Sequence, residues 1–144
     1  MNKKIMISVI TIFGIVFAAI MMKTSSDEGL TPLFNGQDLT GWRASENGDF
    51  RVENSAIVVR GNRAHLFSDR EFKNFEFKCE IMTSPGSNSG LYFHTQYEES
   101  WPSRGYEVQV NTSHGDPVKN GSLWGVVRSF DPMANDNEWF TLEV

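Results

Sequence analysis

Apolar and polar residues alternate along several short stretches of this chain. In the stretch GYEVQVN, from 105 to 111, the two sets are Tyr106, Val108 and Val110 against Glu107, Gln109 and Asn111. Successive side chains of a β-strand point to opposite faces of its sheet. The pattern therefore predicts a strand whose apolar residues face a core. Its polar row would be either solvated surface or a place where something polar binds.

The same pattern recurs between closely spaced turn signals. Further strands are predicted in NFEFKCEIM (74–82), GLYFHTQ (90–96), SLWGVVR (122–128) and WFTLEV (139–144), and a hairpin turning at 53–55 in DFRVENSAIVVRG (49–61). Asn-Gly, Gly-Asn and Asp-Pro pairs separate these runs, and no amphipathic helical period follows Leu30. We therefore expect an all-β fold, a sandwich or jelly roll of two antiparallel sheets.

The first 26 residues differ from the rest. Lys3 and Lys4 precede an uncharged run over 5–22, which predicts one hydrophobic N-terminal helix. Its basic start and position favour a signal peptide cleaved after Ser26, although its length also suits an uncleaved membrane anchor; a buried core helix is the structural alternative. The expected location is outside the cytoplasm, in the periplasm, at the cell surface or secreted. The membrane is expected as a partner only through this segment.

Charge and cysteine content limit the kinds of partner and cofactor that the chain is expected to bind. The net charge of -5, without a basic cluster beyond Lys3 and Lys4, argues against a nucleic-acid partner. Cys79 is the only cysteine and falls on the apolar phase of a predicted strand, so we assign it to core packing. The three histidines match no zinc spacing, and no cofactor is predicted with certainty. Oxygen-rich loops such as 131–137 leave a divalent metal ion as an alternative.

Two motifs resemble a known family. TPLFNGQDLTGW (31–42) and NSGLYFHTQYEESWPSRGYEVQVNTSHGDPVKNGSLWGVV (88–127) are similar, in order, to the bacterial 3-keto-disaccharide hydrolase family, and the resemblance extends over residues 30–144. It implies a concanavalin-like jelly roll. Family members continue beyond this point, and the chain stops at Val144 inside an apparent strand. We therefore expect a C-terminally truncated domain.

The family's chemistry is the cleavage of glycosides that carry a ketone at carbon 3 of the sugar. The ketone acidifies the hydrogen on carbon 2, and a base that removes it allows the group on carbon 1 to leave, by elimination or net hydrolysis. Such a site needs a base, donors for the enolate oxygen and an acid for the leaving oxygen. The expected partner is an oxidised disaccharide or glycoside.

The residues that could perform this chemistry lie on two predicted strands. If Tyr92 and His94 face the same way as Glu107 and Gln109, the four form one polar patch. We expect Glu107 or His94 to be the catalytic proton-transfer group. The family often has Arg where this chain has His94, whereas its Tyr-Glu-x-Gln element is matched. Ordinary polar residues on a wet sheet face are the structural alternative.

Six further residues are candidates for substrate binding: Gln109, Tyr92, Asn88, Trp101, Trp124 and Asn111. The two tryptophans could stack on a sugar ring, with packing at the rim as the alternative. Asn88 could equally shape a turn, and Gly90 allows a close approach or a bulge. Trp42 is assigned to core or sheet-edge packing.

Two functions are in main competition, beside a weaker third, an anchored structural or adhesion domain. The first is an exported enzyme acting on 3-keto-glycosides. The second is a non-catalytic, lectin-like carbohydrate-binding module, because the same fold serves both roles.

Overall fold

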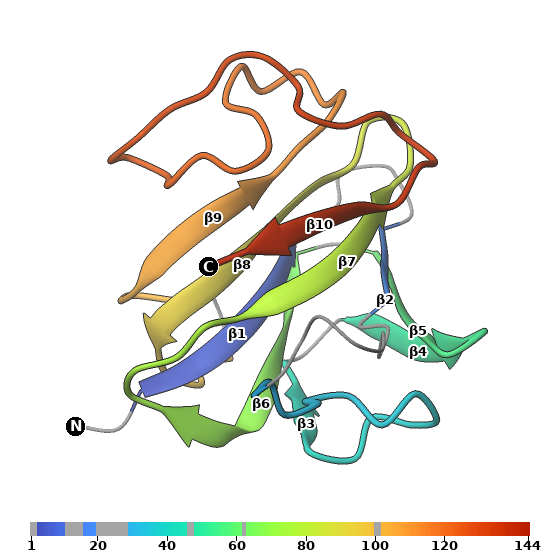
Figure 1. The fold of residues 1–144 in the computed structure, drawn as a ribbon, viewed down its shortest axis with the longest axis vertical. Helices are drawn as coiled ribbons and strands as arrows, with labels where there is room; N and C mark the ends of the chain where they lie inside the picture. Colours follow the sequence, from blue (N-terminus) through green and yellow to red (C-terminus); the bar gives the residue numbers. More distant parts are fainter. Residues whose placement is uncertain (1–2, 11–15, 20–28, 46–47, 62, 100–101) are drawn as a thin grey trace.

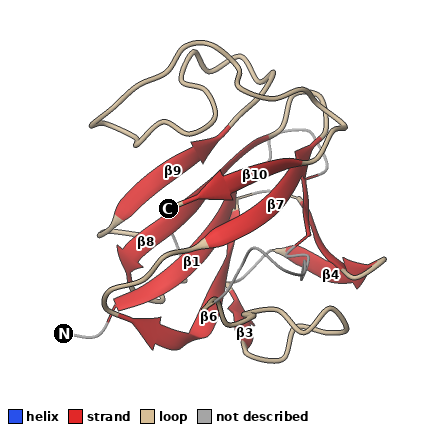
Figure 2. Ribbon diagram, viewed as in Figure 1, coloured by secondary structure: helices blue, strands red, loops and turns tan. Residues whose placement is uncertain are grey.

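The computed structural model describes residues 3–10, 16–19, 29–45, 48–61, 63–99 and 102–144, and these residues contain ten β-strands and no helix (Figures 1 and 2). The strands form two five-stranded antiparallel sheets. The first, here called the site sheet, has the order β3 (Trp42–Ala44), β6 (Ala64–Phe72), β1 (Lys3–Ile10), β8 (Asn88–Thr95) and β9 (Tyr106–Val110). The opposite sheet has the order β10 (Phe140–Glu143), β7 (Lys78–Thr83), β2 (Val16–Ala19), β5 (Ala56–Arg60) and β4 (Asp49–Glu53).

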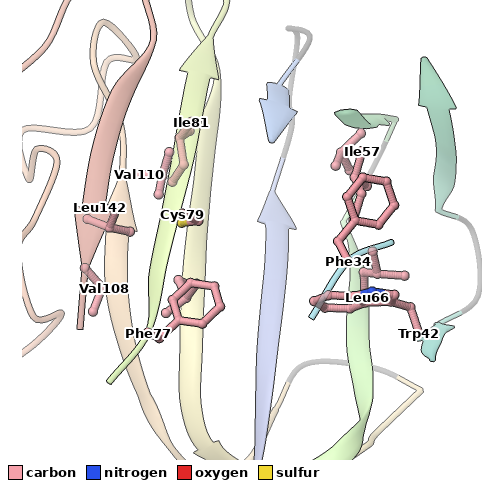
Figure 3. Packing of buried hydrophobic residues seen from close by; sticks show 12 residues of the cluster. Phe34, Trp42, Ile57, Leu66, Phe77, Cys79, Ile81, Val108, Val110 and Leu142 are labelled. Atoms are coloured by element: carbon pink, nitrogen blue, oxygen red, sulfur yellow. The ribbon is translucent and has the colours of Figure 1, made fainter. Parts of the chain in front are cut away.

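The two sheets enclose one hydrophobic core. Figure 3 shows side chains of both sheets directed into a shared interior; Trp42, Leu66, Val108 and Val110 come from the site sheet, and Ile57, Cys79, Ile81 and Leu142 from the opposite sheet. All are buried. Packing of two sheets through their alternating apolar faces defines a β-sandwich and confirms the all-β prediction.

Several local predictions are confirmed. The 49–61 hairpin is β4 and β5, and its two-residue turn has positive φ at Asn54 (52°) and Ser55 (59°), as a tight hairpin turn requires. Cys79 is 4% exposed and lies in the core, where burial raises the pKa of its thiol to about 12. Trp42 is also buried in the core, on the edge strand β3.

One predicted strand is not formed, and one long strand was not predicted. Residues 122–128 were expected to form a strand but form turns, with isolated bridges from Leu123 to Val108 and to Val127. A chain that reverses at Gly125 cannot continue as a strand, because the φ of this glycine is 73°. Strand β6 was not predicted. Its polar residues His65 and Ser68 are both buried, so the stretch lacks the alternation of a half-exposed strand.

The N-terminal run was predicted to be one helix, whereas its described residues are strands. β1 lies between β6 and β8, and β2 lies between β7 and β5. In a continuous apolar run, hydrophobic periodicity alone does not distinguish a buried helix from a buried strand. Residues 11–15 and 20–28, with the cleavage site predicted after Ser26, lie outside the described part of the chain. Within the described residues, no helix has the length and hydrophobicity to cross a membrane.

Candidate active site

The predicted polar row lies on the face of the site sheet that points away from the core. β8 and β9 pair antiparallel, with Tyr92 opposite Glu107 and Gly90 opposite Gln109. Val108 and Val110 enter the core. Because side chains alternate along a strand, Glu107 and Gln109 project to the other face, as the sequence predicted. Figure 1 shows the two strands side by side, with the long irregular segment between β9 and β10 beyond them.

Glu107 is a buried carboxylate with one strong hydrogen bond. It is 7% exposed, and the Tyr92 hydroxyl donates to its Oε2 over 2.6 Å. Burial raises the pKa of Glu107; the hydrogen bond from Tyr92 opposes this rise, and the negative charge of Asp116 adds to it. Burial and the neighbouring carboxylate also raise the pKa of Tyr92, so its hydroxyl stays protonated and remains a donor. A carboxylate with a raised pKa is suited to act as a base near neutral pH.

Gly90 makes room for this carboxylate. A Cβ atom at position 90 would lie 2.3 Å from Oε1 of Glu107 and 2.7 Å from its Cγ. Real atoms do not approach so closely, so a larger residue here would displace Glu107. The sequence indicated a close approach at Gly90, and the structure identifies the approaching group as the Glu107 side chain.

A pocket of about 180 Å³ opens beside the Tyr92–Glu107 pair. Its walls are Tyr92, Pro102, Ser103, Arg104, Gly105, Tyr106, Glu107 and Trp124. Trp124, predicted as a sugar-stacking residue, lines it and is 46% exposed. Sites that enclose a whole drug-sized ligand measure about 300–1,000 Å³, so this pocket suits a smaller group such as a single sugar ring.

The backbone fixes Trp124 relative to the carboxylate. The backbone N–H of Trp124 donates to the carbonyl of Glu107 over 2.8 Å. An indole beside a carboxylate and a hydroxyl is a usual combination for holding a sugar, because the ring face is apolar and the hydroxyl groups need polar partners.

The other end of the polar row is closed. Gln109 is 2% exposed, and its Nε2 donates to Oδ1 of Asn88 over 3.1 Å. Asn111 is fully buried; its Nδ2 donates to the carbonyls of Asp116 and Val118, and its Oδ1 accepts from the backbone N–H of His114. The structure therefore places Asn88, Gln109 and Asn111 under the 112–120 loop, where they hold the loop in place.

His94 does not join the patch. Its φ is 57°, in the left-handed region, so the alternation of β8 ends there. Its ring lies 5.4 Å from that of Phe93, 6.2 Å from that of Phe75 and 6.4 Å from that of Tyr106, between ring centroids. Phe75 and Phe93 pack against the core. His94 thus belongs to an aromatic cluster, and the expectation that it shares a face with Tyr92 is wrong.

The structure gives no support for a ligand role of the remaining candidates among its described residues. Trp101 lies outside the described residues. His114 accepts the backbone N–H of Asp116 on its Nδ1, which is the turn role that the sequence favoured. In the described part of the chain, no group of three or more His, Cys, Asp or Glu side chains is arranged to hold a metal ion.

Arg104 and Ser103 line the pocket but were not predicted from the sequence. The only available signal was their position in SRGYE, directly before the strand that carries Glu107. A basic residue in a loop has no periodicity from which its direction can be predicted.

Comparison with known families finds a match. The family model described as the 3-keto-alpha-glucoside-1,2-lyase-like domain matches residues 29–144, which include both sequence motifs and every described residue of the pocket. No curated protein and no solved structure matches the chain.

Proposed function

The chain belongs to the 3-keto-alpha-glucoside-1,2-lyase-like family, and on this basis we propose that it cleaves 3-keto-glycosides by removing the proton on carbon 2 of the oxidised sugar. The family's name implies a carbohydrate substrate. The observation that carries the proposal is the buried Glu107 carboxylate, bonded to Tyr92 and bordering a pocket of the size of one ring.

Glu107 is the base in this proposal. Its carboxylate takes the proton from carbon 2, and the electron pair of the C–H bond forms a C2=C3 double bond while the ketone oxygen becomes an enolate. The electrons then return: the C3 carbonyl re-forms, C1=C2 forms and the C1–O bond breaks. The leaving oxygen takes up a proton. Atoms and charges balance without an oxidant or reductant.

Tyr92 prepares Glu107 for this step. Its hydroxyl bonds Oε2 in the charged form of the carboxylate, so it orients the group and limits the rise in its pKa. Because the pKa of Tyr92 itself is raised, the phenol keeps its proton while Glu107 accepts one. General-base catalysis by such a group contributes about 10²–10⁴-fold to the rate.

The first product of this reaction is an unsaturated ketone. Addition of water to it gives net hydrolysis, so hydrolase and lyase outcomes differ only after the C1–O bond has broken. We propose that elimination comes first, and the transient near-ultraviolet absorption of the conjugated ketone is the signal that separates it from direct hydrolysis.

Export forms part of the proposal, on the sequence evidence of Lys3, Lys4 and the uncharged run that follows. Cleavage after Ser26 would remove β1 and β2, which lie inside the two sheets. The intact mass of protein recovered outside the cytoplasm distinguishes a cleaved chain from one that keeps this segment.

The test of the proposed function is turnover of a 3-keto-glucoside that carries a chromogenic leaving group. Wild-type protein is expected to release the chromophore, and Glu107→Gln is expected to be inactive while still folded. Glu76→Gln is the matched control, because Glu76 is exposed and lies outside the pocket. The unoxidised glucoside should not be cleaved.

The carbohydrate-binding module makes the opposite prediction. It is favoured by the half-exposed Trp124 at the pocket, which could hold a sugar without any chemistry. Saturable binding of unoxidised oligosaccharides, with no turnover of any oxidised glycoside, would replace the enzyme proposal with this one.

A further inference from the structure

We propose that Arg104 binds the ketone oxygen on carbon 3 and stabilises the negative charge that this oxygen acquires when Glu107 removes the proton. This inference rests on the proposed function and adds the group that recognises the oxidised position. It concerns a residue that neither the sequence motifs nor the family match assigns to a role.

The location of Arg104 supports this role. It lines the same pocket as Glu107, and among the described residues of that lining it is the only one with a positive charge. Guanidinium groups stay protonated at every physiological pH and carry several N–H donors in one plane. Arg104 can therefore donate hydrogen bonds to an enolate but cannot serve as its proton donor.

Arg104 is free to face a ligand. Among the described residues, no carboxylate lies within 4.0 Å of its guanidinium nitrogens. The nearby Glu98 is engaged elsewhere: its Oε1 accepts from the backbone N–H of Ser103 over 3.0 Å and from the Ser103 hydroxyl over 2.8 Å. These bonds, more than the charge of Arg104, lower the pKa of Glu98.

The backbone around Arg104 is held in place on both sides. On the preceding side, Glu98 accepts two hydrogen bonds from Ser103. On the following side, Gly105 has a φ of 119°, and a Cβ atom there would lie 2.7 Å from the carbonyl oxygen of Phe93. Only glycine allows this close turn against β8. These contacts hold the backbone of Arg104 beside the pocket, and its exposed side chain can turn toward a bound substrate.

The hydroxyl groups of Tyr92 and Ser103, which also line the pocket, are less suited to the enolate. The hydroxyl of Tyr92 donates to Glu107. The hydroxyl of Ser103 donates to Glu98. Arg104 carries the positive charge among the described lining residues, so it is suited to the oxygen on which negative charge develops. A hydroxyl group at that carbon would acquire no charge for Arg104 to stabilise.

The experiment isolates enolisation from cleavage. The probe is 1,5-anhydro-3-keto-glucitol, which has the ketone and the carbon-2 hydrogen but no exocyclic leaving group on carbon 1. In heavy water, mass spectrometry follows the entry of deuterium at carbon 2. Wild type is expected to catalyse this exchange. In Arg104→Met we expect the exchange rate to fall by about 10²–10³-fold, as for loss of a donor to a developing oxyanion.

Two further variants make the result specific. Arg104→Ala should regain part of the exchange rate when guanidinium chloride is added at millimolar concentration, which a purely structural role would not produce. Arg128→Met is the matched control, because Arg128 is an exposed cation that does not line the pocket, and its exchange rate should equal that of wild type.

The two proposals fail in different ways. If wild type catalyses no exchange, the proposed function is overturned and this inference with it. If wild type exchanges the proton and Arg104→Met does so at the same rate, the inference about Arg104 is overturned and the proposed function stands. Equal losses in Arg104→Met and Arg128→Met would also overturn it, since a general loss of positive charge would then explain both.

Discussion

The two ends of the polar row on the site sheet have the same sequence pattern and different environments. At one end, Glu107 borders an open pocket and makes its side-chain hydrogen bond to Tyr92. At the other end, Gln109 and Asn111 lie beneath the 112–120 loop, and their amide groups bond to Asn88 and to the loop backbone. Alternation selects the face of the sheet, whereas the covering loop decides which part of that face can meet a substrate.

The two ends of the row also affect stability in opposite directions. The buried amides have partners for their hydrogen bonds, so their burial stabilises the loop. The buried carboxylate has a raised pKa, so keeping it charged at neutral pH costs stability. Groups that reduce stability in this way are common in active sites.

The largest effect is expected from Glu107→Gln. Loss of the base should lower kcat by about 10²–10⁴-fold. Because folding raises the pKa of Glu107, the folded chain binds more protons than the unfolded chain between the two pKa values, and stability falls as pH rises through that window. The variant lacks this loss, so its Tm at pH 7 should equal or exceed that of wild type. At pH values below 4.5, the ordinary pKa of a glutamate side chain, this gain in Tm should disappear.

Thermal unfolding of both proteins at several pH values, together with turnover, checks this prediction. A variant that loses activity and also loses stability at pH 7 would show that Glu107 is a structural group of the same kind as Asn111.

The next effect is expected from Gly90→Ala. The new Cβ atom must push the Glu107 carboxylate away from its site over the sheet and weaken its bond to Tyr92. A displacement of about 1 Å can cost about 10²-fold in rate, and we expect a fall in kcat of that order. Gly115→Ala is the control, because nothing lies within 4 Å of a Cβ atom there. Equal activity of the two variants would contradict the placement of Glu107.

Asn111→Ala tests the closed end of the row. Truncation removes hydrogen bonds from the carbonyls of Asp116 and Val118 and from the N–H of His114, all beneath or within the loop. Lost bonds to buried groups cost about 1–3 kcal/mol each, and we expect a total loss of about 2–4 kcal/mol in the free energy of unfolding.

Urea unfolding measures this loss, with the exposed Asn135→Ala as the control. The kcat of folded Asn111→Ala should match that of wild type. A variant that keeps its stability but loses kcat would place Asn111 in contact with substrate, as the sequence had suggested.

The smallest effect is expected from His94→Asn. Asparagine tolerates the left-handed backbone at this position, and the His94 ring lies in the aromatic cluster of Phe75, Phe93 and Tyr106. The kcat should therefore be unchanged, and only a small change in Tm is expected. A loss of kcat as large as that of Glu107→Gln would restore His94 as a candidate base.

Features that depend on local pattern could be predicted from the sequence. The phase of GYEVQVN separates Val108 in the core from Glu107 on the site face, and two residues with positive φ close the 49–61 hairpin where the sequence placed its turn. The family motifs predicted the match over residues 29–144. Each of these predictions depends only on residues that are neighbours in the sequence, or on motifs that follow one another in a recognisable order.

Features that depend on distant contacts could not be predicted. The positive φ of His94 reverses the expected direction of its side chain, and nothing in LYFHTQ marks a residue with a left-handed backbone. Gln109 is buried because the 112–120 loop covers it, and this loop has no hydrophobic periodicity from which its path could be predicted. Arg104 lines the pocket next to Gly105, which lies close to the backbone of β8, and this is a tertiary contact.

The pH dependence of kcat/KM in wild type and in Tyr92→Phe tests the central claim most directly, because its acid limb reports the pKa of the base in the free enzyme. If Glu107 is the base, wild type has an acid limb with an apparent pKa above the ordinary value of 4.5. Loss of the Tyr92 hydrogen bond, which lowers the pKa of Glu107, should move that limb to still higher pH. An acid limb at the same pH in both proteins would contradict the assignment of Glu107 as the base.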